Sequence, residues 1–220
     1  MKSEWALRED IVEVGKRLYQ AGYIRGADGN LSVRMTHDEV LITPSRSAKG
    51  FLDPKDLVVV DLQGNLIAGG RQPSLETFFH LAIYREREEV RAVVHAHPPR
   101  TIAFTVANRD IPQDVLPEIT ILFPHGVPVI PYETPATERL GEEIRTAINI
   151  ADAVILSHHG IIGVGQDIYE AWATIEHVEA CVEVLSIAST LGGITSLPRH
   201  KLHELEGIRT LVQEARSRNF

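Results

Sequence analysis

The residues best suited to chemistry are two histidines with one residue between them. His95 and His97 belong to the run Val93-Val94-His95-Ala96-His97, whose apolar residues predict a buried strand. Side chains two positions apart on a strand point to the same face, so both imidazoles are expected to face one point. An isolated pair of this kind is more often polar surface, but histidine is also the commonest metal ligand. A third ligand elsewhere in the chain would complete the set that catalytic zinc sites usually have.

A second histidine pair supplies that candidate. His158 and His159 follow the apolar run of residues 153–156 and precede Gly160, where glycine would let the backbone come close to a ligand. Adjacent strand residues face opposite sides, so only one of the two is expected to bind the ion. Two histidine clusters at strand ends, in a chain with a single cysteine, favour a catalytic metal site over a structural one.

A glutamate is the candidate acid or base. Glu76 follows Ser74 at the start of an apolar pattern with helical spacing, where we expect a helix over residues 75–86 with Ser74 as its N-cap. The helix dipole alone favours a glutamate in a first turn. Near a metal, however, the same carboxylate is suited to proton transfer. The backbone N–H groups at this helix end are also suited to binding an anion.

Strands and helices interleave along the chain without strict alternation. Apolar periodicity predicts helices over residues 3–21, 75–86, 101–108, 137–149, 168–191 and 201–217. Strands are expected over residues 31–34, 39–43, 57–62, 66–67, 92–96, 153–156 and 161–164. Residues 115–132 are expected to add two short extended stretches. This order predicts one α/β domain with a mixed sheet.

Composition narrows the class of protein. A length of 220 residues with 44% hydrophobic residues fits one large globular domain. The net charge of −8 argues against a nucleic-acid partner, whose binding surfaces are basic. Cys181 is the single cysteine, so no disulfide can form within the chain. No targeting signal and no apolar run of about 18 residues is visible, so we expect a cytoplasmic protein without a membrane partner.

Five short motifs follow one another in a recognisable order. They are Gly29-Asn30-Leu31-Ser32-Val33-Arg34, Ile42-Thr43-Pro44-Ser45, Pro73-Ser74-Leu75-Glu76, His95-Ala96-His97 and His158-His159-Gly160. Together they resemble the class II aldolase/adducin family, of which fuculose-1-phosphate aldolase and ribulose-5-phosphate 4-epimerase are the best-known enzymes. The resemblance runs over roughly residues 5–190. It implies a single domain over residues 1–220 with a three-layer αβα sandwich around a largely antiparallel sheet, and a homotetramer with active sites at subunit interfaces.

The resemblance also assigns roles within the site. It implies that His95, His97 and His159 bind zinc, and that Glu76 is the acid/base that can touch the resting metal. Other divalent transition metals suit such a histidine set as well. Positions that bind substrate phosphate in the sugar-phosphate aldolases are matched here by Gly29, Asn30, Ser45, Arg46 and Ser74. The alternative interpretation is that these five are turn residues without a binding role.

The chain departs from the fuculose-phosphate enzyme in three respects. Leu75 stands where that enzyme has a second serine, and Arg46 stands where it has glycine. Its proton-donating tyrosines have no clear equivalent, since Leu116 occupies the first region and no tyrosine follows Tyr169. Glu118 falls near the catalytic glutamate of the related methylthioribulose-1-phosphate dehydratase. It is expected either to transfer a proton at a neighbouring subunit's site or to be a solvated charge at a strand end.

The expected activity is that of a zinc-dependent aldehyde-lyase. A class II aldolase cleaves a small ketose or ketose phosphate through an enediolate that zinc stabilises as a Lewis acid. Epimerisation, dehydration or decarboxylation by the same metal-enolate chemistry is the alternative. A non-catalytic adducin-like module is less favoured, because such a module has no reason to keep a complete ligand set.

Overall fold

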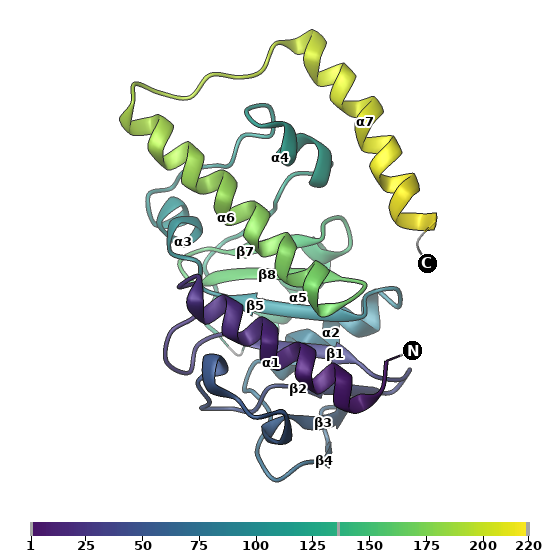
Figure 1. Ribbon diagram of the computed structural model, residues 1–220. Coiled ribbons are helices and arrows are strands. Elements are labelled where there is room, and N and C mark those ends of the chain that lie inside the picture. The colour runs from purple at the N-terminus through teal and green to yellow at the C-terminus, as the bar shows by residue number, and fades with distance from the viewer. Residues whose placement is uncertain (1, 136, 219–220) are drawn as a thin grey trace.

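The computed structural model describes residues 2–135 and 137–218, and its centre is a sheet of eight strands (Figure 1). The strand order is β4-β3-β2-β1-β5-β8-β7-β6, and every neighbouring pair is antiparallel except β6 with β7. The strands are β1 (Asn30–Arg34), β2 (Glu39–Ile42), β3 (Val58–Asp61), β4 (Leu66–Ala68), β5 (Ala92–Ala96), β6 (Val129–Ile130), β7 (Ala153–Leu156) and β8 (Gly160–Gly165).

Helices cover both faces of this sheet. The helices are α1 (Glu4–Gln20), α2 (Thr77–Glu86), α3 (Pro99–Val106), α4 (Pro117–Leu122), α5 (Glu138–Ile148), α6 (Ile168–Thr190) and α7 (Arg199–Arg218), with 3-10 turns η1 (Lys49–Phe51) and η2 (Pro54–Asp56). One apolar cluster joins α1 and α6 to one face, and a second joins α2 and α5 to the other. The expected three-layer αβα sandwich with a largely antiparallel sheet is therefore confirmed.

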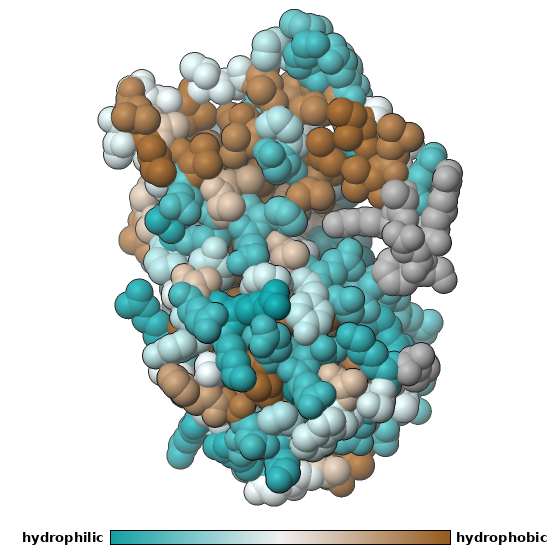
Figure 2. Space-filling view, in the orientation of Figure 1, coloured by the Kyte–Doolittle hydropathy of each residue, from teal (hydrophilic) through white to brown (hydrophobic). Residues whose placement is uncertain are grey.

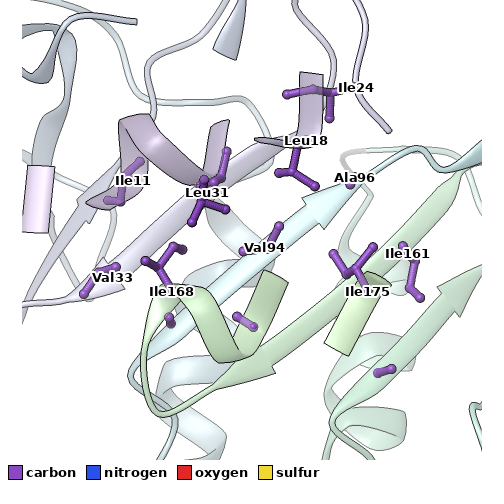
Figure 3. Packing of buried hydrophobic residues seen from close by; sticks show 14 of the residues in the cluster. Ile11, Leu18, Ile24, Leu31, Val33, Val94, Ala96, Ile161, Ile168 and Ile175 are labelled. Atoms are coloured by element: carbon purple, nitrogen blue, oxygen red, sulfur yellow. The ribbon is translucent and has the colours of Figure 1, made fainter. Parts of the chain in front are cut away.

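Strand alternation divides the central strands between the two layers. Leu31 and Val33 of β1 pack with Val94 of β5 beneath α1 and α6, where Ile168 and Ile175 reach the sheet (Figure 3). The intervening side chains of β1 face α2 and are polar, although they too are buried. On β5 the same alternation sends the Val94 side to the first cluster and the His95 side to the second layer. The buried polar side chains of β1 and that of His95 thus lie on the face of the sheet that α2 covers.

Residues 115–132 differ from the expected pair of extended stretches. They contain the short helix α4, and only Val129–Ile130 forms a strand. Pro117 occupies the first helical turn, where its restricted backbone suits a helix start. Ile119 and Phe123, four residues apart, are buried in the cluster that α6 also joins. This helical spacing is the signal that the expectation of strands overlooked.

The start of α2 also differs from the expectation. The helix begins at Thr77 rather than at residue 75, and Glu76, not Ser74, occupies the N-cap position. Ser74 is held in an extended pairing instead, because its N–H donates to the Thr43 carbonyl at 3.3 Å. Its own carbonyl then accepts from the Thr77 N–H at 3.1 Å. The predicted role of Ser74 as N-cap is wrong.

Apolar surface gathers at one end of the molecule. Figure 2 shows hydrophobic side chains concentrated over α4, α7 and the end of α6, whereas the rest of this face is largely hydrophilic. The exposed apolar residues of α6, of the segment after it and of α7 are Val184, Ile187, Leu191, Ile194, Ile208 and Leu211. Even so, none of the helices in the described ranges has the length and apolar character needed to cross a bilayer.

A buried carboxylate ties α6 to the start of α3. Glu179 is fully buried, and it accepts hydrogen bonds from the backbone N–H groups of Arg100 at 3.0 Å and Thr101 at 2.8 Å. The Thr101 hydroxyl donates to the same carboxylate at 2.7 Å. These groups begin α3, which directly follows the β5 strand that carries His95. Glu179 therefore caps a helix from a distant part of the chain.

We expect Glu179→Gln to destabilise the fold by about 1–3 kcal/mol, because an amide N–H₂ would face N–H donors and leave buried groups unpaired. The measurement is urea unfolding followed by circular dichroism. Glu183→Gln is the matched control, since Glu183 lies one turn further along α6 and bonds Arg100 at the surface. Its cost should stay within about 0.5 kcal/mol. Equal losses in the two variants would contradict the capping role.

Candidate metal and active site

Three imidazole rings meet beside the sheet. The ring centroids of His95, His97 and His159 lie 4.8–5.0 Å from one another. The Nε2 atoms of His95 and His97 are 3.0 Å apart, and the potential ligand atoms of all three residues lie within 4.8 Å of one another. Tetrahedral zinc with Zn–N bonds of 2.0–2.1 Å separates its ligand nitrogens by about 3.3 Å. The cluster can therefore hold a metal ion.

Neighbouring strands bring these histidines together. His95 lies on β5, His97 directly follows it, and His159 lies in the turn between β7 and β8. Because β8 pairs with β5, the turn before β8 reaches the end of β5. The Nδ1–H of His95 donates to the Ile161 carbonyl of β8 at 3.0 Å, which leaves Nε2 as the acceptor that faces the cluster. Asp28 lies 4.0 Å from Nδ1 of His97 and orients that ring less tightly.

Two glycines make this close approach possible. A Cβ at Gly160 would lie 2.5 Å from the Ala96 carbonyl oxygen and 2.8 Å from the ring of His97. A Cβ at Gly29 would lie 2.8 Å from the His95 carbonyl oxygen, and Gly29 also has a left-handed φ of +69°. Any larger residue would push the strands apart or displace the imidazoles. The space around Gly160 thus shows a close approach to β5 and the imidazoles, while the predicted approach to a ligand stays a prediction.

Glu76 lies against the histidine cluster. Its Oε2 is 3.6 Å from Nε2 of His95, and its Oε1 is 3.5 Å from Nε2 of His159. Asn30 holds the carboxylate by donating from Nδ2 to Oε2 at 2.6 Å, a short charge-assisted hydrogen bond. The Glu76 side chain is only 17% exposed. A carboxylate in this position can contact a bound ion or move a proton at a substrate atom beside it.

The donor chemistry of the cluster fits a divalent cation. Burial, together with the neighbouring imidazoles, lowers the pKa of His95 and His97 to about 3. Both rings are therefore neutral at physiological pH, the form in which histidine binds metal. Nδ1 of His159 is buried without a hydrogen-bond partner in the described part of the chain, while its Nε2 faces Glu76. The arrangement of Nε2 atoms leaves each of the three free to act as a ligand.

The residues predicted to bind substrate lie on the segments around this cluster. Ser45 and Ser74 are brought together because Pro44 and Pro73 form an isolated antiparallel bridge, and both serines line one groove with the exposed Leu75. Arg46 is exposed with a left-handed φ of +52°. This backbone conformation favours glycine, so an arginine at this position is strained.

Other candidates fall outside the cluster. His158 is exposed with a φ of +62°, its ring bonds Ser157, and His159 rather than His158 joins the other two histidines. Glu118 lies in the first turn of α4, not at a strand end, and is exposed. Among the described residues, no hydrogen bond or ion pair links Glu118 to Glu76 or to the three histidines. Any catalytic part for Glu118 stays a prediction that needs a second subunit.

The sequence did not reveal two buried polar residues beside the site. Lys49 is 2% exposed and donates to the Ala27 carbonyl at 2.6 Å; burial lowers its pKa to about 8, against the charges of Asp28 and Glu76. His80 of α2 is fully buried and bonds Asn30. A lysine in a loop and a histidine in a helix carry no sequence signal of such contacts. Only the hydrophobic spacing of α2 indicated that position 80 faces the sheet.

Acid should destabilise the metal-free protein through its buried histidines. The pKa values of His80, His95 and His97 fall from 6.5 to about 3, mainly by burial. The unfolded chain therefore binds more protons between about pH 6.5 and pH 3, so the free energy of unfolding must fall as the pH falls through that window. Each histidine contributes up to about 1.4 kcal/mol per pH unit. Urea unfolding in excess chelator checks this, and a constant stability from pH 7 to pH 5 would contradict it.

Comparisons with known proteins show the family of this chain. Residues 9–186 match the family described as Class II Aldolase and Adducin N-terminal domain. A 3-oxo-tetronate 4-phosphate decarboxylase of Haemophilus influenzae is 34% identical, over 87% of this chain and 90% of that protein. A 5-deoxy-D-ribulose 1-phosphate aldolase of Bacillus thuringiensis is 32% identical, over 90% and 92%. The solved structure of an L-fuculose 1-phosphate aldolase superposes with a TM-score of 0.82 at 28% identity, covering 93% of this chain and 96% of that one. This chain belongs to the class II aldolase/adducin family.

Proposed function

We propose that this protein is a zinc-dependent carbon–carbon lyase acting on a small phosphorylated sugar or sugar acid. The observation that carries the proposal is the approach of three imidazoles to one point with the Glu76 carboxylate against them. The relatives named above act as a decarboxylase and an aldolase, and both reactions break a carbon–carbon bond next to a carbonyl group. A non-catalytic module would not need this arrangement.

The metal would be held by His95, His97 and His159. Bound there, zinc would supply Lewis-acid stabilisation of the negative charge that forms on the substrate oxygens when the bond breaks. Histidine ligands also admit manganese or cobalt, so metal availability contributes to the choice of ion. His95 is held for this role by its Nδ1–H bond to Ile161, and the neutral state of His95 and His97 avoids a proton release that would oppose binding.

Glu76 would move the proton in this reaction. Cleavage leaves an enediolate, whose carbon must gain a proton before the product departs. Glu76 is mostly buried, lies beside the cluster and is held by Asn30, so in its protonated form it would deliver a proton to a defined carbon and be left as the carboxylate. The same carboxylate can occupy the open side of the metal before substrate arrives.

The phosphate group of the substrate would bind in the groove that Ser45 and Ser74 line, and the predicted contribution of Gly29 stays a proposal. Both serines offer hydroxyl donors there, and Arg46, next to Ser45 in the sequence, would add a cation. Asn30 was also expected to bind phosphate, but both ends of its amide are engaged by Glu76 and His80. Its contribution would therefore be to the acid/base.

Decarboxylation of a 3-oxo sugar-acid phosphate is the reaction we place first. Aldol cleavage requires a base that removes the proton of the departing hydroxyl group, whereas a carboxylate leaves as CO₂ without such a step. Among the described residues, no hydrogen bond joins a tyrosine hydroxyl to Glu76 or to the three histidines. This reverses the order expected from the sequence, where aldol cleavage came first. Aldol cleavage stays the second candidate, with Glu118 of a neighbouring subunit as the added base.

Assembly into a homotetramer follows the family and stays a proposal. The apolar surface over α4, α7 and the end of α6 supports association, because an exposed patch of this kind commonly marks an interface (Figure 2). A site completed across that interface would explain why the expected catalytic Glu118 lies on α4, away from its own histidine cluster.

Product analysis with Glu76→Gln tests the proposed reaction. The zinc-loaded protein is expected to release CO₂ from a 3-oxo-tetronate 4-phosphate, and the variant is expected to lose about 10²–10⁴-fold in kcat because the proton can no longer be delivered. Glu13→Gln, on the outer side of α1, is the control and should keep full turnover. An aldehyde product from a ketose phosphate would instead support aldol cleavage. Full turnover in Glu76→Gln would exclude Glu76 as the acid/base. Purified protein that contains no metal and whose activity is unaffected by a chelator would exclude a zinc-dependent lyase.

Arg46→Gly tests the phosphate site. Removing the left-handed strain should stabilise the fold by about 1 kcal/mol. Losing the cation should raise KM for a phosphorylated substrate about 10-fold, the cost of one charge-assisted hydrogen bond. Arg46→Lys keeps the charge and should bind the substrate more nearly as the unaltered protein does. If KM for the phosphorylated substrate does not change in Arg46→Gly, Arg46 is not part of the site.

A further inference from the structure

One chain of hydrogen bonds runs from the candidate acid/base into the protein interior. It alternates between α2 and β1, and its members in order are Glu76, Asn30, His80, Ser32 and Tyr84. Asn30 bonds Glu76 at 2.6 Å, His80 Nε2 bonds Asn30 Oδ1, Ser32 bonds His80 Nδ1 at 2.7 Å, and Tyr84 bonds Ser32 at 2.8 Å. None of the sequence motifs assigned a part to His80, Ser32 or Tyr84.

The two elements match in repeat, which is why the chain is continuous. Glu76, His80 and Tyr84 are four residues apart on the α2 segment, a spacing of about 6.0 Å along a helix. Asn30 and Ser32 are two residues apart on β1, a spacing of about 6.6–6.8 Å along a strand. Because these two spacings are similar, side chains of the helix face and of the strand face can alternate along their contact. Each strand side chain therefore reaches the gap between two helix side chains.

The direction of every bond in this chain is determined. The Glu76 carboxylate accepts, so the Asn30 amide must turn its N–H₂ group toward it and its oxygen toward His80. His80 must then carry its proton on Nε2, which leaves Nδ1 as an acceptor for the Ser32 hydroxyl. The Tyr84 oxygen accepts from the Val93 N–H, and its own hydroxyl donates to Ser32. All the donors point toward Glu76.

Burial keeps this chain in one protonation state. His80, Ser32 and Tyr84 are fully buried, and Asn30 is 2% exposed. Burial lowers the pKa of His80 to about 3 and raises the pKa of Tyr84, so both side chains are neutral. The ring of Phe79 stacks on His80 and meets His95 edge-on, which prevents the His80 ring from tilting away. A charged His80 would donate from both nitrogens and reverse the Ser32 bond.

We propose that His80 is a positioning residue, which holds the Asn30 amide so that its N–H₂ group, and never its oxygen, faces the Glu76 carboxylate. Without the Nε2–H donor, the Asn30 amide is free to turn over and set its oxygen against Glu76, where two acceptors repel. The consequence for turnover rests on the proposed function, since it needs Glu76 to be the acid/base. The chain itself does not depend on that function.

Kinetics of two substitutions test the positioning role. His80→Leu removes both hydrogen bonds and fills the buried position with an apolar side chain. We expect kcat to fall about 10–100-fold, the usual cost of losing a residue that orients a group in the site, and KM to change less than about 2-fold. His80→Gln can still donate to Asn30 and should recover most of kcat. Glu179→Gln is the control for stability alone: it destabilises the fold away from Glu76 and should leave kcat unchanged. A kcat for His80→Leu equal to that of Glu179→Gln would overturn the proposal.

The tautomer of His80 can be measured without any turnover. Two-dimensional NMR of protein labelled with ¹⁵N-histidine, in metal-free and zinc-loaded forms, should show His80 as the neutral Nε2–H tautomer at pH 7, with its signal assigned from its loss in His80→Gln. An Nδ1–H tautomer or a doubly protonated ring would overturn the proposed direction of the chain. If no lyase activity is found but the Nε2–H tautomer is, the proposed function fails while the hold of His80 on Asn30 stands.

Discussion

The close contact of β5 with its two neighbours is the constraint on which the site depends. His95 sits opposite Asn30 on β1 and opposite Ile162 on β8. One residue of β5 therefore lies between β1, whose Asn30 bonds Glu76, and β8, which directly follows His159. Gly29 and Gly160 permit this approach because neither side has room for a Cβ. The three imidazoles and the carboxylate converge because backbone from four distant segments can come within contact distance at this one place.

The two faces of the sheet differ in the side chains that their strands bury. On the α1 and α6 side the strands present a continuous apolar cluster, whose burial stabilises the fold. On the α2 side a row of buried polar groups crosses an otherwise apolar layer. Such groups are costly unless each finds a partner, and here nearly every one does. An Arg34 guanidinium continues the row by donating to the Tyr84 carbonyl and lying over its ring.

Local patterns predicted the parts of this structure that depend on neighbours in sequence. The period of two in β5 was enough to set His95 and His97 on one face, and apolar spacing gave α1 and α6 nearly to the residue. The pairing of Asn30 with Glu76 joins residues 46 positions apart, and that of His80 with Asn30 joins residues 50 apart. Nothing local encodes such contacts. The spacing of His80 in the sequence reports burial, not the identity of what it touches. Lys49 lies in a segment without such spacing, so its burial carries no sequence signal.

The arrangement explains how one family can carry out several reactions. The cluster, Glu76 and the donor chain behind it form one buried unit built on β1, β5, α2 and the β7–β8 turn. Under the proposed function, this unit would serve any reaction that passes through an enediolate, and groups outside it would decide what departs from the substrate. In this chain those groups are the ones that differ from the fuculose-phosphate enzyme: Arg46 and Leu75 lie on exposed segments beside the groove, and Glu118 lies on a separate helix. Substitution there leaves the buried polar row intact, so a change of leaving group requires no new core, whereas a change in the row would disturb every reaction at once.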